Sequence, residues 1–209
     1  MKNKTDNIEE HFVDLGLPSG LKWAKCNLGA KTETDYGNYY MWGSTEPSTA
    51  EECNWANTPF NNGSDSYNEE YFTTHKSEWL DDKDNLKPEF DVAYKAMNGM
   101  GRMPTRGEIQ ELLSGTTNEW ITNYNGTGVN GRKFTGSNGN SIFIPAADFR
   151  SGSSFYGRED YNGDIWSSSL FTSRPKNAWY LNFFSDDFYV DYADRNYGLM
   201  VRGVYENLL

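Results

Sequence analysis

Hydrophobic and polar residues alternate over short stretches of the chain, and turn-forming residues separate these stretches. Residues 11–30 hold two short apolar segments on either side of a Pro-Ser-Gly turn at residues 18–20, which predicts a β-hairpin. The apolar run at residues 39–43 predicts a buried strand, and residues 44–85 are polar and predict a long loop. The aromatic residues expected to hold this loop are Trp55, Tyr67, Tyr71 and Trp79.

Two segments in the middle of the chain predict helices. The first covers residues 88–97, and the second begins after Thr105, which has Glu108 three positions later in the spacing of a capping box. The apolar face of the second helix would carry Ile109, Leu112 and Leu113. Further on, residues 126–139 predict a hairpin rich in Gly and Asn, and residues 141–145 predict a buried strand. The pattern therefore predicts an α+β fold of short antiparallel strands, two helices and long loops.

Composition supports one globular domain and excludes some partners. With 209 residues, the default is a polar tail at residues 1–10 followed by a single domain at residues 11–209. Hydrophobic residues make up only 36%, but the aromatic share of 16% supplies apolar area for a core. A net charge of −11 without any basic stripe argues against nucleic acid as a partner. No signal peptide or membrane-spanning stretch is recognisable, so direct membrane insertion is not expected.

The segment at residues 178–184 has the period of a strand. Alternation puts Trp179, Leu181 and Phe183 on one face, which we expect to be core. Tyr180 and Phe184 would then point outward, which is costly for large side chains unless a ligand covers them. Tyr residues among Asp, Asn and Ser continue to residue 199, as in adaptable recognition loops. The alternative is that these aromatics form a second core layer.

Several sequence motifs, taken together, are similar to those of a known protein family. They are VDLGLPSGLKWAKCNLGA at residues 13–30, GRMPTRGEIQELL at 101–113, IFIPAADFRSG at 142–152, and IWSSS, NAWYLNF and NYGLMVRGV within 165–204. In these motifs the chain resembles the Fibrobacter succinogenes major paralogous domain family. The resemblance implies a C-type-lectin-like fold and, for some members, a variable protein of a diversity-generating retroelement, in phage tails or on bacterial surfaces, including pilus-tip adhesins. It places a variable region at about residues 164–204.

The resemblance also implies a mutational mechanism that the composition can test. Rewriting both adenines of an AAY codon yields residues such as Tyr, Phe, Asp, Leu and Ser, and never Lys, Glu, Gln, Met or Trp. Residues 177–199 contain no Lys, Glu or Gln, whereas Lys176 and Met200 do not fit such a codon. The residues predicted to vary and to bind ligand are Phe171, Arg174, Tyr180, Phe184, Asp187, Phe188, Tyr189, Asp191, Tyr192, Asp194, Tyr197 and Leu199. The residues predicted to be scaffold are Trp166, Trp179, Leu181, Phe183, Val201 and Arg202.

Catalytic and metal-binding motifs are weak. Calcium-dependent lectins resembling this fold use Glu-Pro-Asn and Trp-Asn-Asp triplets, and this chain has only Glu-Pro-Ser at residues 46–48. Asp residues within 186–194 are expected to be solvated, with a bound ion as the alternative. Cys26 and Cys53 are expected to be free thiols, with one disulfide left open, and they do not suit the formylglycine-generating enzymes of similar fold. His11 and His75 lack a nearby nucleophile in sequence, so no catalytic residue, cofactor or metal is predicted.

Two functions remain open at this point. The first is a receptor or adhesin domain that recognises a protein or glycan on a target cell through its variable surface. The second is a structural domain of a tail fibre, pilus or surface assembly, in which the same aromatics form a fixed contact between subunits. A cell surface, a pilus or a phage particle is the expected location, and a homo-oligomer or a larger particle is an open possibility. An enzyme is not expected, because no motif requires a catalytic pocket.

Overall fold

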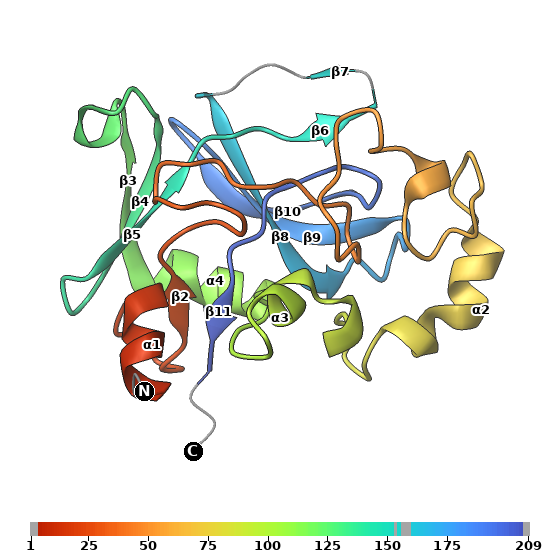
Figure 1. Cartoon of the computed structure of the whole chain (residues 1–209), viewed down its shortest axis with the longest axis horizontal. Helices are drawn as coiled ribbons and strands as arrows, with labels where there is room; N and C mark the ends of the chain where they lie inside the picture. The colour runs from red at the N-terminus through yellow and green to blue at the C-terminus, as the bar shows by residue number, and fades with distance from the viewer. Residues whose placement is uncertain (1–3, 153, 156–159, 207–209) are drawn as a thin grey trace.

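The first and last strands of the chain meet in one sheet. Strand β1 (Phe12–Asp14) pairs with β2 (Lys22–Ala24) as the hairpin predicted from the Pro-Ser-Gly turn, and β11 (Val204–Tyr205) pairs with the other edge of β2. The computed structural model describes residues 4–152, 154–155 and 160–206, and its fold is α+β (Figure 1).

Most strands lie in small antiparallel sheets. One sheet has the order β3-β4-β5, a second has the order β10-β9-β8, and a short ladder joins β6 to β7. The strands of these sheets are β3 (Thr116–Ile121), β4 (Gly131–Gly136), β5 (Ser141–Pro145), β6 (Arg150–Ser151), β7 (Ser154–Phe155), β8 (Asn162–Leu170), β9 (Asn177–Phe184) and β10 (Phe188–Asp194). The expected hairpin at residues 126–139 is therefore only partly right, because the turn lies between β4 and β5 and the first Gly residues precede β4.

The described residues contain more helix than the predicted two. The α-helices are α1 (Lys4–His11), α2 (Glu69–Trp79), α3 (Val92–Ala96) and α4 (Arg106–Gly115). Short 3-10 turns are η1 (Trp55–Asn57), η2 (Pro88–Phe90) and η3 (Tyr124–Gly126). The helix expected at residues 88–97 is divided between η2 and α3, and Asp91 caps α3 by accepting a hydrogen bond from the Tyr94 amide.

Three sequence predictions are wrong in detail. The polar tail at residues 1–10 includes most of α1, whose Ile8 is buried against Phe12. The loop at residues 44–85 contains α2, which Asn68 caps. Residues 39–43 are buried as expected but form only one bridge, between Tyr40 and Leu199, and no strand.

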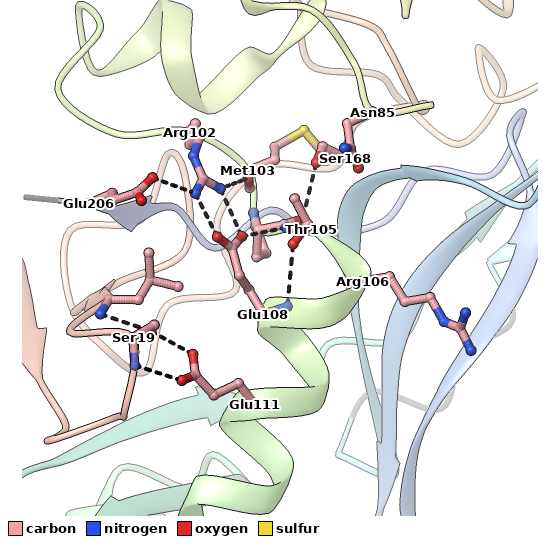
Figure 2. A network of polar contacts seen from close by, with 12 residues as sticks. Ser19, Asn85, Arg102, Met103, Thr105, Arg106, Glu108, Glu111, Ser168 and Glu206 are labelled. Carbon is pink, nitrogen blue, oxygen red and sulfur yellow. Dashed lines mark hydrogen bonds and ion pairs between the residues drawn. The ribbon is translucent and has the colours of Figure 1, made fainter. Parts of the chain in front are cut away.

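Helix α4 begins at the predicted capping box, and its side chains make polar contacts with two other segments of the chain. The Thr105 side chain accepts a hydrogen bond from the Glu108 amide, and Glu108 accepts one from the Thr105 amide. Figure 2 shows the Glu108 carboxylate also holding Arg102, with N···O distances of 2.6 and 2.8 Å, while Glu111 accepts two hydrogen bonds from Ser19 in the β1–β2 turn. The capping box therefore sets where α4 starts, and these contacts set where it lies.

Two hydrophobic clusters lie on opposite sides of the β8–β9–β10 sheet. The first joins α4 and the β3–β4–β5 sheet to this sheet and includes Ile109, Leu112, Phe134, Leu181 and Phe183. The second includes Trp42, Phe72, Trp79, Trp166, Ala178, Leu199 and Val201. A large side chain fully buried in either cluster contributes about 1.5–3 kcal/mol of transfer free energy. The sheet is therefore a central layer with apolar contacts on both faces.

Candidate functional site

The two faces of the β8–β9–β10 sheet carry different side chains. In the strand register, Tyr180 is opposite Asp191 and Asn182 is opposite Tyr189, while β8 places Asp164 beside Asn182. Directly paired residues share a face of a sheet. We call the face with these five residues the pocket face.

The other face, which we call the helix face, lies against α4. It carries the pairs Trp179–Tyr192, Leu181–Val190 and Phe183–Phe188. Helix α4 contacts all three strands, and its Ile109 and Leu112 share a hydrophobic cluster with Leu181 and Phe183. The alternation predicted for residues 178–184 is therefore correct in its period.

The predicted ligand-binding residues do not share one surface. Those on the pocket face or at its margin are Tyr180, Phe184, Tyr189, Asp191, Asp194, Tyr197 and Leu199. Those on the side of the helix face are Phe171, Arg174, Phe188 and Tyr192, because Phe171 stacks on Tyr192 at 4.3 Å and Arg174 lies 5.9 Å from the same ring. Tyr192 also contributes to the lining of the pocket described below. Asp187 lies in the turn between β9 and β10. Because side chains alternate along a strand, the Tyr and Asp residues of β9 and β10 are divided between the two faces of the sheet. The sequence alone predicts one surface for them.

Three residues differ from their expected environment. Trp179, expected in the core, is half-buried and lies between Phe171 and the Arg106 guanidinium, which is 3.9 Å from its ring. Tyr180, expected to point outward, packs edge-on against Trp166 at 6.0 Å, and burial raises the pKa of its hydroxyl. Leu199 is only 1% exposed. The second core layer therefore accounts for part of the aromatic segment.

The other predicted scaffold residues are buried. Trp166, Leu181, Phe183, Val201 and Arg202 have relative exposures of 0%. The Arg202 guanidinium donates hydrogen bonds to the backbone oxygens of Ala24 and Phe143, at 3.0 and 2.8 Å. Burial lowers the pKa of Arg202 to about 10.

A pocket of about 300 Å³ opens beside Tyr180 at the edge strand β10. Its lining includes Asp164, Asn177, Tyr180, Asp194, Tyr197 and Leu199. Phe149, which also lines the pocket, stacks on Tyr197 with ring centroids 5.0 Å apart. The pocket thus has aromatic walls and carboxylates, and several of its residues belong to the predicted variable set.

Asp164 is the buried acid of this pocket. The side-chain amides of Asn162 and Asn182 donate hydrogen bonds to its two carboxylate oxygens, at 2.8 and 2.5 Å. Burial raises the pKa of Asp164 to about 7, and the negative charges of Asp148 and Asp191 contribute in the same direction. The prediction from sequence missed Asp164, because it stands among other polar residues of strand β8, such as Asn162 and Ser167, and the sequence does not show that it is buried.

Buried amide oxygens beside the pocket lack partners. In the described part of the chain, Asn177 Oδ1 and Asn182 Oδ1 are inaccessible and accept no hydrogen bond. The amide nitrogens of both Asn side chains donate hydrogen bonds to carboxylates: Asn177 donates to Asp194 at 2.6 Å, and Asn182 donates to Asp164. Their oxygens are therefore oriented acceptors without a donor, which is uncommon for buried polar atoms.

The remaining candidate chemistry is accounted for by packing. Cys26 and Cys53 are free thiols, and burial raises the pKa of Cys53 to about 11. His75 lies against Tyr71 and Trp79 in the second cluster. Over residues 4–152, 154–155 and 160–206, no group of three His, Cys, Asp or Glu side chains is arranged to hold a metal ion. None of the helices among those residues is long and apolar enough to cross a bilayer.

Comparison with known proteins returned no match among family models, curated proteins or solved structures. The features that describe this site are consequently its own geometry and chemistry: a partly exposed sheet face, a pocket with aromatic and acidic lining, and buried residues beneath it.

Proposed function

We propose that the chain is a ligand-binding receptor or adhesin domain of C-type-lectin-like fold, with a C-terminal binding surface diversified by a retroelement. Its ligand is a protein or glycan on a target cell. The observation that carries the proposal is the pocket face, where side chains from β9, β10 and the following segment gather around one pocket above a buried framework.

The chemistry of the pocket face supports binding. Tyr189 is 39% exposed, and Asp191 and Phe184 are partly exposed nearby, so wide aromatic area is combined with hydrogen-bonding groups. Tyr supplies contact area with little rotamer entropy to lose, and such residues dominate adaptable recognition surfaces. A rewritten AAY codon cannot encode Lys, Glu, Gln, Met or Trp. Residues 177–199 contain none of these except Trp179.

The test is to sequence the native locus and the last roughly forty codons of the gene in sister isolates, a window that spans strands β9 and β10. We expect a near-identical downstream repeat that differs mainly at adenines, and a reverse-transcriptase gene beside it. The exposed Tyr189 and the partly exposed Asp191 should vary among isolates, and the buried Leu181 and Phe183 should not.

The burial pattern sharpens that expectation within the predicted set. Leu199 is nearly inaccessible and Tyr180 packs against Trp166, so both should vary less than Tyr189 and Asp191. An invariant segment without any repeat would overturn the diversification and would leave a fixed contact between subunits of a surface assembly as the better account.

A further inference from the structure

We propose that the pocket beside Tyr180 receives the cationic side chain of a protein ligand, a Lys ammonium or an Arg guanidinium. This deepens the proposed function, because it names the chemistry that the pocket face recognises. The structure supports it with three properties of the pocket: aromatic walls, a buried carboxylate and an acceptor that lacks a donor.

The first property is the aromatic lining. Tyr180, Tyr197 and Phe149 contribute to the walls of the pocket. The faces of aromatic rings carry negative charge density and attract cations, by about 0.5–1 kcal/mol at exposed sites and about 2 kcal/mol in desolvated ones. A volume of about 300 Å³ is at the lower end for small-molecule sites and suits one side chain.

The second property is a buried acid without a cation. Among the described residues, the donors to the Asp164 carboxylate are the side-chain amides of Asn162 and Asn182, and none is a Lys or Arg side chain. The charges that act on Asp164 come from Asp148 and Asp191, and both are negative. A buried carboxylate in such surroundings is stabilised when a cation enters.

The rim of the pocket already holds one ammonium group. Lys176 Nζ lies 3.2 Å from Asp194 Oδ1, and both side chains are partly exposed. This pair is intramolecular and neutralises Asp194, while Asp164 keeps its negative surroundings. A ligand ammonium that reaches further in would meet Asp164 and the unpaired acceptor of Asn177.

The third property distinguishes a cation from other ligands. Asn177 lines the pocket, and its Oδ1 is an oriented acceptor, because a hydrogen bond to Asp194 holds its amide nitrogen. A ligand that satisfies this oxygen must donate a hydrogen bond, and an ammonium or guanidinium group is donor-only. A sugar hydroxyl also donates, but it gains nothing from the negative charges around the pocket.

The experiment is an NMR titration of the full chain with N-α-acetyl-lysine methylamide. Its comparison probes are the same compound acetylated on the ε-nitrogen and a methyl hexoside. We expect saturable shifts from the charged probe alone, centred on resonances of Tyr180 and Tyr197. Asp164→Asn should weaken binding at least tenfold, since a buried charge partner is worth more than about 1.4 kcal/mol.

Two further variants control for charge and for folding. Asp191→Asn removes a nearby negative charge outside the pocket lining and should weaken binding by about threefold, whereas Asp186→Asn makes the same change in the exposed β9–β10 turn and should have no effect. Equal binding of the ε-acetylated probe, preference for the hexoside, or no saturable binding of any probe would each overturn the proposal. Those outcomes leave the sequencing test of diversification unaffected, so the two proposals can fail separately.

Discussion

At the scale of single residues, Asp164 shows how burial changes the acid chemistry of the site. Within the part of the chain that the structure describes, its two carboxylate oxygens accept hydrogen bonds from Asn162 and Asn182, and no cationic side chain pairs with them. Asp164 and its neighbour Asn162 could be seen in the sequence, but the burial of Asp164 and its contact with Asn182 arise from strands that come together only in the fold. Sequence reasoning therefore found the exposed Tyr and Asp residues and missed the buried acid.

Asp164 predicts a pH dependence of stability. The pKa of its side chain is raised to about 7 in the folded chain, compared with about 3.9 in an unfolded chain. The folded state thus keeps a proton that the unfolded state releases, so the contribution of Asp164 to the free energy of unfolding falls as pH rises from about 4 through 7. The local slope reaches about 1.4 kcal/mol per pH unit.

Urea unfolding between pH 4 and 8 checks this expectation. Asp164→Asn should remove that downward component of the slope, while Asp186→Asn, in the exposed turn, should keep the wild-type slope. The groups that act on Asp164 are Asp148 and Asp191, and both are unchanged in the two variants. An unchanged slope in Asp164→Asn would show that the carboxyl is solvated in the folded chain.

At the scale of elements, short-range signals predicted the hairpin and the start of α4 correctly. The Pro-Ser-Gly turn and the capping box act within a few residues, so a sequence displays them directly. Helix α2 was missed because its two buried residues, Phe72 and Trp79, are separated by seven positions in an otherwise polar segment. Its stability comes from aromatic contacts with residues outside the helix, including Phe60, which stacks on Trp79.

The ion pair between Glu108 of α4 and Arg102 gives a prediction at this scale. Burial alone would raise the pKa of Glu108, but hydrogen bonds and the charge of Arg102 lower it. Glu108→Gln removes this ion pair and weakens the capping box, so the free energy of unfolding should fall by about 1.5 kcal/mol at pH 7. Glu111→Gln, which affects an exposed contact to Ser19, should cost about 0.5 kcal/mol.

Chemical denaturation of both variants measures the difference. Glu108 contributes stability above the pKa of an unfolded Glu, and this contribution is lost as pH falls through its lowered folded pKa. The two variants should therefore become more alike in acid. Equal losses at pH 7 would mean that the capping box and its Arg102 partner add nothing beyond an exposed contact.

At the scale of the whole molecule, Arg195 joins segments that are distant in sequence. It is 0% exposed, its guanidinium carbon lies 4.1 Å from the Phe72 ring, and its Nε donates to the Pro175 backbone oxygen at 2.9 Å. Its own backbone oxygen accepts from the Trp42 amide at 3.1 Å. The segment after β10 is thereby tied to α2 and to the buried aromatic run near residue 40.

Arg195→Ala should lower the free energy of unfolding by about 3 kcal/mol, because it leaves a cavity and an unpaired buried carbonyl. Arg174→Ala, an exposed change of the same type, should stay within about 0.5 kcal/mol. Thermal and urea unfolding of the two variants give the comparison. Similar stabilities would mean that Arg195 fills space without holding the segments together.

The sheet that joins both ends of the chain has a mechanical consequence. Strands β1 and β11 both run antiparallel to β2, so they run parallel to each other on its two sides. The chain enters β1 at one end of this sheet and leaves β11 at the opposite end. A tension applied between the two ends therefore loads the backbone hydrogen bonds of β2 in shear, all together, instead of opening them one after another.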